Sequence, residues 1–427
     1  MVKTRFAPSP SGYLHIGGVR TALYAWLFAR NQGGEFLLRI ENTHIQRSSQ
    51  ESIDSIMEGL KWLGLDHDGE VIYQKDRFDI YQERANQLIK EGKAYESEGA
   101  IRLKSDRTSN IVIKDRVFGD VEVNKDELDD FIIMRSNGAP TYHLAVVIDD
   151  HESGITHVMR GDDHLKNTAR HIQLMNAFNY PIPQFVHLPM ILGSDGSRLS
   201  KRHGAMNVLH YRDEGFSSEA LLNYLVRLGW SKGDQEIFSI QEMTDGFDLS
   251  GINKASAKFD IEKLRWVNQQ HLLNTDDSEL KMMLEAGSAT AKGLNDEVIT
   301  NFINAYKNRA STINDLISSC DSLFSDEIKY DQAIADKFLK KEILFALKDV
   351  VDALQGSRWN QESISEALKS VCEKHQIGFG KIGQPIRIAV TGGTQSPSID
   401  QTLILLDQSI VVDRIEAAIE YIEENSN

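Results

Sequence analysis

Two short segments, far apart in the chain, carry residues whose types and spacing could hold a phosphorylated ligand. They are PSPSGYLHIGG at residues 8–18 and DGSRLSKRHG at residues 195–204. The residues that could act on such a ligand are His15, Gly17, Gly18, Ser200, Lys201 and Arg202. Together they supply hydrogen-bond donors and positive charge but no obvious nucleophile. Such groups could bind a nucleoside triphosphate and stabilise charge during a displacement reaction at one of its phosphorus atoms.

The first segment lies between a predicted strand and a predicted helix. Residues 4–7 read as the end of a short strand, and apolar residues at helical spacing predict a helix over 19–30. A helix N-terminus offers backbone N–H groups and a partial positive charge to an anion. Gly17 and Gly18 would let a ligand come close to the backbone, and His15 would add a side-chain donor.

The second segment places two cations beside a serine in a predicted loop. Mobile loops that carry cations often close over phosphates and stabilise charge that develops during a reaction. A solvated basic turn is the alternative interpretation of this loop taken alone. We expect Lys201 and Arg202 to face the ligand because both segments occur in one chain.

Two arginines and a glutamate end predicted strands of the same region. Arg5 ends the first strand and Arg160 a later one, so at one sheet edge they could clamp a carboxylate. Glu41 ends the second strand and could pair with an amine. Scaffold salt bridges are the alternative role for each of these residues.

The pattern of elements predicts an α/β protein with a helical tail. A strand over 35–41 and a helix over 49–63 continue the strand–helix alternation of a parallel sheet, at whose carboxyl edge ligands bind. Short β-like runs predict a small inserted subdomain within residues 100–135. Residues 144–149 and 156–160 read as strands of the first sheet. From about residue 217 to the end, the chain is expected to be mostly helical.

Composition excludes several classes of protein. The 427 residues include 47 basic and 63 acidic ones, and this net charge of −16 argues against non-specific nucleic-acid binding. We therefore expect neither DNA nor, without a long apolar run, a membrane as partner. Two cysteines exclude a disulfide framework and favour the cytoplasm. Cys372 and His375 have metal-ligand spacing but lack a second pair of ligands, so no metal site is expected.

Longer stretches of the chain resemble the bacterial-type glutamyl-tRNA synthetases, which are class I aminoacyl-tRNA synthetases. LHIGG at 14–18 is similar to the HIGH signature of that family, and RLSKR at 198–202 is similar to its KMSKS signature. The resemblance covers nearly the whole chain. Its further matches are TRFAPSPSG at 4–12, PTYHLAVVIDDHESGITHVMRGDDHL at 140–165, HLPMILGSDG at 187–196, EALLNYLVRLGW at 219–230, KASAKFDIEKLRWVNQQHL at 254–272 and GKIGQPIRIAVTGG at 380–393.

The resemblance implies a two-step reaction. The α-carboxylate of glutamate attacks the α-phosphorus of ATP, and the 2′-hydroxyl of the terminal adenosine of tRNA(Glu) then takes the glutamyl group. His15, Lys201 and Arg202 would be catalytic. Gly17, Gly18, Ser200 and Lys201 would bind ATP, with Mg²⁺ as its companion ion. The resemblance implies a glutamate pocket formed by Arg5, Ser9, Glu41, Tyr142 and Arg160.

The resemblance also implies a domain order. A Rossmann-like catalytic domain would occupy residues 1–95 and 139–205, split by a shortened acceptor-binding insertion at 96–138. A stem-contact region at 206–265 and an α-helical anticodon-binding region at 266–427 would follow. The family expectation is a monomer.

Three departures from the family pattern stand out. Asn42 and His44 occupy positions that usually carry aspartates, which could alter contacts to the tRNA acceptor end. The connection between Tyr95 and Ala100 is abrupt where many relatives have several dozen residues, often with zinc-binding cysteines, so we expect a small zinc-free insertion. Asp162 replaces a more usual glutamate.

Two alternatives to a tRNA(Glu) ligase remain open at this point. One is an enzyme that also or only charges tRNA(Gln), and the other is a non-catalytic RNA-binding paralogue. The intact HIGH-like and RLSKR segments weigh against the paralogue. The helical tail disfavours a glutaminyl-tRNA synthetase, which would carry β-barrels there.

Overall fold

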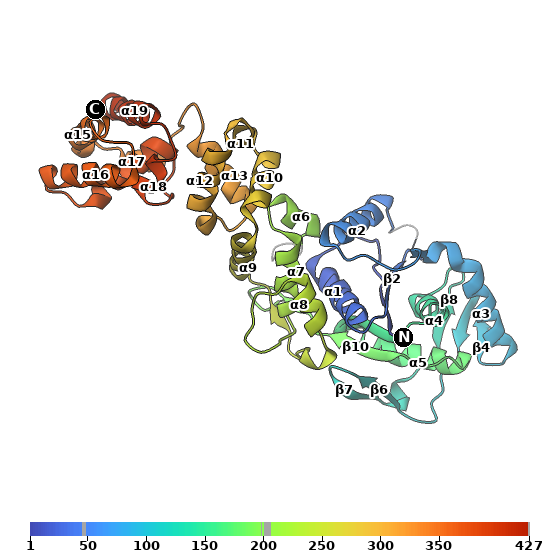
Figure 1. Cartoon of the computed structure of the whole chain (residues 1–427). Coiled ribbons are helices and arrows are strands. Elements are labelled where there is room, and N and C mark those ends of the chain that lie inside the picture. The colour runs from blue at the N-terminus through green and yellow to red at the C-terminus, as the bar shows by residue number, and fades with distance from the viewer. Residues whose placement is uncertain (45–47, 198, 200–205, 426–427) are drawn as a thin grey trace. The chain divides into compact units, whose positions relative to one another are not determined.

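The computed structural model of the protein describes residues 1–44, 48–197, 199 and 206–425 (Figure 1). The chain divides into two compact units, Met1–Val267 and Asn268–Asn427. The first unit contains the sheets, and the described part of the second contains only helices and loops. Across these described residues, no helix is both long and apolar enough to cross a membrane.

The first unit is built on two parallel sheets that meet edge to edge. Strands β1 (Lys3–Phe6), β2 (Glu35–Ile40) and β3 (Ile72–Tyr73) form one sheet in that order. In the other, β10 (Gln184–Leu188) lies parallel to both β9 (His157–Gly161) and β6 (Ile111–Asp115).

Hydrogen bonds join the two sheets beside β1. The Lys3 backbone N–H donates to Oγ1 of Thr156 at 2.9 Å, and the Thr156 N–H donates to the Lys3 carbonyl oxygen at 3.0 Å. The strand order therefore reverses between β1 and β9, which confirms the predicted Rossmann-like arrangement. In such sheets, ligands bind at the carboxyl edge where the order reverses.

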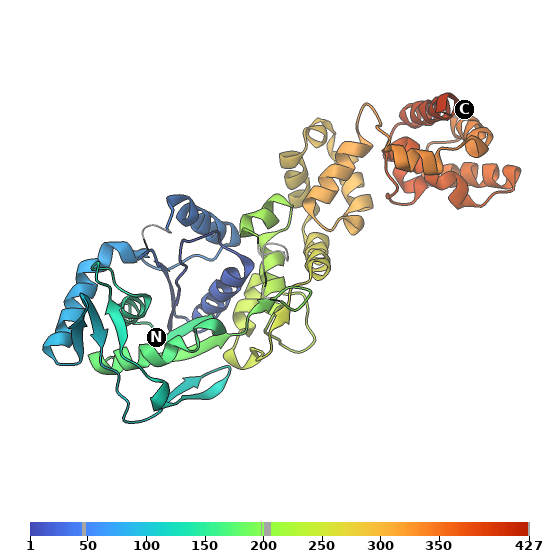
Figure 2. The ribbon, with the colours of Figure 1, turned by 180° about the vertical axis from the view of Figure 1, so that it is seen from behind.

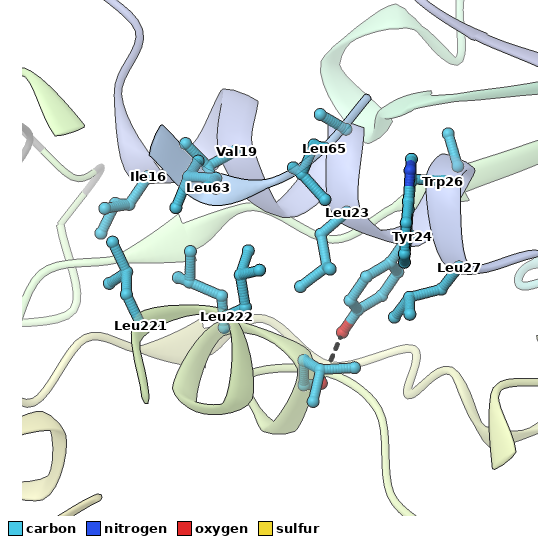
Figure 3. Close-up of a cluster of buried hydrophobic side chains, with 14 of the residues drawn as sticks. Ile16, Val19, Leu23, Tyr24, Trp26, Leu27, Leu63, Leu65, Leu221 and Leu222 are labelled. Carbon is cyan, nitrogen blue, oxygen red and sulfur yellow. Dashed lines mark hydrogen bonds between the residues drawn. The ribbon is translucent and has the colours of Figure 1, made fainter. Parts of the chain in front are cut away.

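Helix α1 (Ile16–Asn31) forms the centre of the core of this unit. It follows β1 and packs against the end of α2 (Gln50–Leu63) and against α7 (Ser218–Arg227), as Figure 3 shows. Leu23 and Leu27 are fully buried there, and the Tyr24 hydroxyl donates to the carbonyl oxygen of Val226 at 2.9 Å. Contacts between residues about two hundred positions apart in the sequence thus fix the position of α1.

One element differs from the sequence-based prediction. Residues 144–149, predicted as a strand, belong to helix α4 (Tyr142–Glu152). Leu144, Ala145, Val147 and Ile148 are fully buried, so the helix has no polar stripe along its middle. A short apolar run that is buried on all sides has no periodicity that separates a helix from a strand. The strand predicted over 156–160 is confirmed as β9.

The insertion does not fold as one piece apart from the sheets. Strands β4 (Ala94–Ser97), β5 (Ala100–Leu103) and β8 (Phe131–Met134) form an antiparallel sheet. Strand β6 instead pairs with β10 and carries β7 (Gly119–Val123) at its outer side. Part of the insertion therefore extends the sheet of the catalytic half.

The abrupt connection after Tyr95 is a two-residue hairpin turn. Ser97 pairs with Ala100, and the turn residues Glu98 and Gly99 have φ values of 54° and 76°. Positive φ at both central residues is typical of a type I′ turn, whose twist matches that of antiparallel strands.

Helices occupy the rest of the first unit and the whole described part of the second. In the first unit, α3 (Phe78–Lys90) precedes the insertion and α5 (Asn167–Phe178) packs against α4, while α6 (Val208–Asp213) and α8 (Ile240–Gly246) flank α7. Strands β11 (Ile191–Leu192) and β12 (Ala257–Lys258) pair before α9 (Ile261–Asn274) begins. The bounds in the second unit are α10 (Asp277–Gly287), α11 (Ala289–Gly293), α12 (Asp296–Tyr306), α13 (Ile313–Leu323), α14 (Gln332–Phe338), α15 (Leu344–Gln355), α16 (Gln361–His375), α17 (Phe379–Thr391), α18 (Ile399–Leu403) and α19 (Gln408–Asn425).

Helix α19 is hydrogen-bonded to several parts of the second unit. The Arg414 guanidinium donates to the carbonyl oxygens of Leu323, Ser325 and Val390 at 2.6 to 2.8 Å. These carbonyls follow or end α13 and α17, so one side chain joins three helices. In Figure 2 the helices α15 to α19, orange to red, lie next to one another, and their buried apolar side chains belong to one core.

Asp149 ties α4 to the segment that precedes the insertion. Its fully buried carboxylate accepts hydrogen bonds from Gln74 Nε2 and Arg77 Nε, both at 2.8 Å, and from the Tyr81 hydroxyl at 2.9 Å. These partners come from the 3-10 turn Gln74–Arg77 and from α3.

Replacement of Asp149 by Ala should destabilise the first unit strongly. The change leaves the buried donors of Gln74 and Tyr81 and the half-buried guanidinium of Arg77 without this acceptor, which typically costs about 3–5 kcal/mol. The free energy of unfolding of the full chain, from chemical denaturation, measures the effect. Glu91→Ala is the control, because it removes only surface contacts, the pair with Lys93 and the hydrogen bond from Gln87, and should change the unfolding curve little. Equal curves for both variants would show that the Asp149 network does not stabilise the unit.

Candidate functional site

A cavity of about 640 Å³ opens where the strand order reverses. Its walls come from the carboxyl ends of β1, β2 and β9, from the N-terminus of α1 and from the start of α4. The described residues that the sequence analysis assigned to the site all line it: Arg5, Ser9, His15, Gly17, Gly18, Glu41, Tyr142 and Arg160. The structure thus brings together side chains that are up to 155 positions apart in sequence.

His15 caps helix α1 with its own side chain. Its Nδ1 accepts from the backbone N–H groups of Gly17 at 3.1 Å and Gly18 at 3.4 Å. Because Nδ1 is an acceptor, the neutral ring carries its proton on Nε2. The imidazole is exposed, whereas the helix behind it is buried. His15 therefore brings an N–H donor to the same place as the positive end of the helix dipole.

Arg5 is held by a carboxylate that the sequence analysis did not single out. Its Nε and Nη2 donate to the two oxygens of Asp150 at 3.0 and 3.1 Å. Arg39 donates to the same Asp150 through Nη1 at 2.6 Å and to Glu41 through Nη2 at 3.1 Å. The four side chains form a row of alternating charge. Its two end members, Arg5 and Glu41, line the cavity, and the paired Asp150 and Arg39 lie buried behind them.

This row sets the charge of its carboxylates. Burial alone would raise the pKa of Asp150, but the charges and hydrogen bonds of Arg5 and Arg39 outweigh it and lower that pKa to about 2. Burial raises the pKa of Glu41 above its ordinary value, although Arg39 and Arg5 oppose the change. Of the two carboxylates, Glu41 would therefore gain more from a further cation, because such a partner would stabilise its ionised form.

Arg160 differs from the buried Arg5 and Arg39, because its partners are neutral. A fourth buried arginine, Arg20, also lines the cavity, and it donates to the carbonyl oxygens of Pro189 and Leu228. Tyr142, Thr168, the backbone of His164, His171 and His187 accept from the Arg160 guanidinium. Among the described residues, no carboxylate lies within ion-pair distance of Arg160. Burial lowers its pKa, so the cation is poorly solvated. The cavity therefore has an excess positive charge at its Arg160 end, where an anionic group can bind.

The second predicted segment is largely outside the described residues. Ser200, Lys201 and Arg202 lie outside the described residues. Leu199, which comes directly before them in sequence, is described. It lines the cavity and packs against the apolar core of the first unit. The chain is therefore anchored next to the cavity at Leu199, two residues before Lys201 in the sequence.

The two departures at positions 42 and 44 have different surroundings. Asn42 is buried, and its Oδ1 accepts from the backbone N–H of Lys75 at 2.9 Å, a role that an aspartate oxygen could also fill. His44 lines the cavity, and its Nε2 lies 3.1 Å from Nη2 of Arg135, which follows strand β8 of the insertion. Only His44 therefore changes the chemistry of the cavity wall.

Sequence reasoning missed the residues that hold the predicted ones. Asp150 accepts from Arg5, and Arg39 donates to Glu41. His187 accepts from Arg160 and is itself hydrogen-bonded to Asp115. A signal did exist for some of them. Asp149-Asp150 ends an apolar run, and His187 interrupts another, and a polar residue in an apolar run is often a buried, hydrogen-bonded one.

The described residues offer no group of three or more His, Cys, Asp or Glu side chains that could hold a metal ion. Cys320 and Cys372 are free, buried thiols whose pKa values are raised by burial. The His375 ring, which has metal-ligand spacing from Cys372 in the sequence, contacts the carboxylate of Asp349.

Comparisons with known proteins agree along the whole chain. Residues 1–100 and 96–266 match the family of tRNA synthetases class I (E and Q), catalytic domain, and residues 270–419 match an anticodon binding domain. The chain is 44% identical to glutamate–tRNA ligase 1 of Alkalilimnicola ehrlichii, with all of this chain and 99% of that protein covered. It is 42% identical to the glutamate–tRNA ligase of Nitrosomonas europaea, with 98% and 99% covered.

Solved structures give the same result. The structure of a glutamate–tRNA ligase from Elizabethkingia meningosepticum in complex with its amino acid has a TM-score of 0.85 and 31% identity, with 99% of each chain covered. The enzyme from Elizabethkingia anophelis has a TM-score of 0.82, also at 31% identity. The sequence alignment with the A. ehrlichii relative is 466 positions long, so that relative carries residues that this chain lacks. The chain belongs to the glutamate–tRNA ligases, a family of class I aminoacyl-tRNA synthetases.

Proposed function

We propose that the protein activates L-glutamate with ATP and transfers it to tRNA(Glu). In the first step the α-carboxylate of glutamate attacks the α-phosphorus of ATP, and pyrophosphate leaves with the electron pair of the broken P–O bond. In the second step the 2′-hydroxyl of the terminal adenosine attacks the activated carbonyl, and AMP leaves. The attacking carboxylate is already ionised, so the first step needs positioning and charge stabilisation rather than a general base.

The observation that carries this proposal is the buried Arg160 with neutral partners. A substrate with a second carboxylate can compensate its charge, and the γ-carboxylate of glutamate has the required charge and planar shape. Glutamine, which is neutral there, would leave the guanidinium without a counter-charge. Tyr142 beside Arg160 and Ser9 at the mouth would add hydrogen bonds, and Glu41 would receive the α-amino group.

ATP would bind at the other end of the cavity, against the start of α1. Gly17 and Gly18 have no side chains that would keep the phosphates of ATP away from the backbone, and the His15 N–H would donate to these phosphates. Lys201, Arg202 and Ser200 would complete this end by bringing cations to the charge that develops on the leaving pyrophosphate. Leu199, in contact with the core beside the cavity, supports this placement of the loop.

Mg²⁺ would accompany ATP as the ion of its phosphates. The described side chains form no cluster that could hold a metal ion on their own. The site therefore suits a Mg²⁺ ion whose ligands come mainly from the phosphates of ATP. The ion would neutralise phosphate charge. The zinc-free insertion stays a prediction, to be checked by metal analysis of the purified protein.

Different regions of the chain would take different parts of the tRNA. We assign the acceptor end to residues 96–138, the inner stem to 206–265 and the anticodon to 266–427, with the chemistry at 1–95 and 139–205. The family match of residues 270–419 to an anticodon binding domain supports the last assignment. We propose a cytoplasmic monomer, in keeping with the absence of a membrane-spanning helix among the described residues.

The second candidate acceptor is tRNA(Gln). The feature that keeps this acceptor open is His44, which stands in the cavity wall where the family usually has a carboxylate, faces Arg135 of the insertion and could alter the contact with a tRNA acceptor end. An aspartate would neutralise Arg135, whereas a neutral histidine leaves its charge available to the phosphates of an acceptor end.

Transfer of labelled glutamate, with ATP and Mg²⁺, to purified tRNA(Glu) and tRNA(Gln) in separate reactions tests the proposal. We expect charging of tRNA(Glu) alone. Charging of tRNA(Gln), alone or in addition, would replace this proposal with the second candidate. Charging of neither tRNA by folded protein would contradict both and favour a non-catalytic RNA-binding role.

Arg160→Ala should raise the KM for glutamate much more than the KM for ATP. Loss of a charge-assisted contact worth about 3 kcal/mol corresponds to a rise of about 100-fold. Steady-state charging at saturating tRNA measures both constants. Arg84→Ala is the matched control, because Arg84 is a partly exposed arginine outside the cavity that should leave both constants unchanged. Equal effects on both substrates would remove Arg160 from the glutamate pocket.

Lys201→Ala should keep the fold and lower the rate of adenylate formation by orders of magnitude, about 100-fold or more for a lost donor to developing charge. Single-turnover formation of the adenylate and a thermal melt separate the two effects. Lys61→Ala serves as the control, since Lys61 is an exposed lysine on α2 that does not line the cavity. A folded Lys201→Ala protein with an unchanged rate would contradict the proposed role of the loop.

A further inference from the structure

Arg160 is held by a complete shell of acceptors. An arginine side chain has five N–H groups, and five acceptors surround this one. Nε donates to His187 Nε2 at 3.1 Å. Nη1 faces the Tyr142 hydroxyl and His171 Nδ1, both at 3.2 Å, and Nη2 faces Thr168 Oγ1 at 2.7 Å and the His164 carbonyl oxygen at 3.4 Å. The plane of the guanidinium is therefore fixed before any substrate binds.

The acceptor for Nε depends on a carboxylate from the insertion. Oδ2 of Asp115 lies 2.7 Å from His187 Nδ1 and also accepts from the His187 backbone N–H at 3.1 Å. Its Oδ1 accepts from the backbone N–H groups of Val117 and Phe118, both at 2.9 Å. Both side chains are fully buried. Every group around Asp115 donates, so the His187 proton must be on Nδ1, and its Nε2 lone pair faces Arg160.

The charge states of this chain of groups agree with its geometry. Burial would raise the pKa of Asp115, but the hydrogen bond from His187 and the backbone donors outweigh it and lower that pKa. Burial lowers the pKa of His187, although Asp115 opposes the change. A second neutral ring, His171, accepts from Arg160 on the other side, and burial lowers its pKa well below the ordinary value. Two neutral imidazoles can thus accept from one cation.

We propose that Asp115 and His187 are positioning residues for glutamate recognition, which act by orienting the guanidinium of Arg160. The inference rests on the proposed function of Arg160 and deepens it. The Asp115 carboxylate fixes the tautomer of His187, and His187 then fixes the rotation of Arg160 about its Nε. Nη1 thereby stays beside Tyr142 and Nη2 beside the His164 carbonyl, in the part of the cavity wall where a carboxylate can share these donors. Asp115 ends strand β6, which pairs with β10 next to His187. A residue of the insertion thereby completes the amino-acid pocket.

The substitution Asp115→Asn separates this role from simple packing. An asparagine fits the same space but must place an NH₂ group either against the Val117 and Phe118 donors or against His187. In the second orientation, His187 Nδ1 becomes an acceptor and its proton moves to Nε2, where it faces the Arg160 Nε–H. The Nε–H of Arg160 then loses its acceptor. The new Nε2–H of His187 also competes with Arg160 Nη2 for Thr168 Oγ1, which lies 3.2 Å from His187 Nε2 and 2.7 Å from Arg160 Nη2, so the guanidinium is held less firmly.

The test is a double-mutant cycle on Asp115→Asn and His187→Gln, with the KM values for glutamate and for ATP as readouts. We expect Asp115→Asn to raise the glutamate KM by about 10-fold, the lower end for a lost hydrogen bond to a charged group, and to leave the ATP KM within about 2-fold. His187→Gln keeps an acceptor for Arg160 that cannot change tautomer. In that background, Asp115→Asn should add little to the glutamate KM.

The pair His187→Gln and His187→Leu keeps the proposal testable if Asp115→Asn fails to fold. Leucine removes the acceptor that glutamine retains, so His187→Leu should raise the glutamate KM well above that of His187→Gln. Asp349→Asn is the control, because Asp349 also pairs with a histidine but lies in the second unit. It should leave the glutamate KM unchanged.

The possible outcomes have distinct meanings. If Arg160→Ala raises the glutamate KM but the Asp115 and His187 variants do not, the positioning role is wrong and the pocket stands. If Arg160→Ala itself has no effect on the glutamate KM, the proposed pocket is wrong. Equal rises in both KM values, or fully additive effects in the cycle, would show that Asp115 and His187 act on stability alone and would overturn the inference.

Discussion

The structure of the catalytic unit depends on two adjacent carboxylates buried at the end of α4. Asp150 holds Arg5 of β1 and Arg39 of β2, and Asp149 holds Arg77 ahead of α3. A buried ion pair is costly to desolvate and is stable only when each partner is fully hydrogen-bonded. Here each charge is compensated by several others, so strands and helices from different parts of the chain must assemble together. The cavity is the product of that assembly.

In the pocket that we propose, the guanidinium of Arg160 would provide the specificity for glutamate. Its neutral partners orient it without cancelling its charge, so this pocket would discriminate by charge as well as by shape. A pocket built in this way selects an acid over its amide by more than size alone would allow, because the wrong substrate leaves a buried cation uncompensated. The same logic explains why so many imidazoles lie near Arg160, since they can accept while neutral and burial keeps them neutral. The pKa of His143, which contacts His171, is lowered by burial to about 4.

Much of the fold could be predicted from the sequence because local patterns and global structure agree there. The helix over 49–63 begins after Ser49, whose side chain caps it, and ends at Gly64, whose φ is 69°. The helix at 142–152 could not be predicted, because an apolar run buried on every side looks alike in a helix and a strand. The residues that line the cavity carried signals of their own, in His15, the glycines and the strand-end charges. Asp150 and His187 carried only the general signal of a polar residue at an apolar run, and Asp115 carried none. Their roles arise from partners that lie far away in sequence, such as Arg5, 145 residues from Asp150.

The type I′ turn at Glu98–Gly99 has a consequence for how this family can diversify. It brings the ends of β4 and β5 to one point at the edge of the antiparallel sheet, so a segment spliced there would enter and leave at the same place. The entropy of closing such a loop grows only with the logarithm of its length, by about 0.6 kcal/mol for each doubling. A module of tens of residues can therefore be gained or lost at this turn during evolution while the register of the sheet, and the amino-acid site beyond it, stays the same.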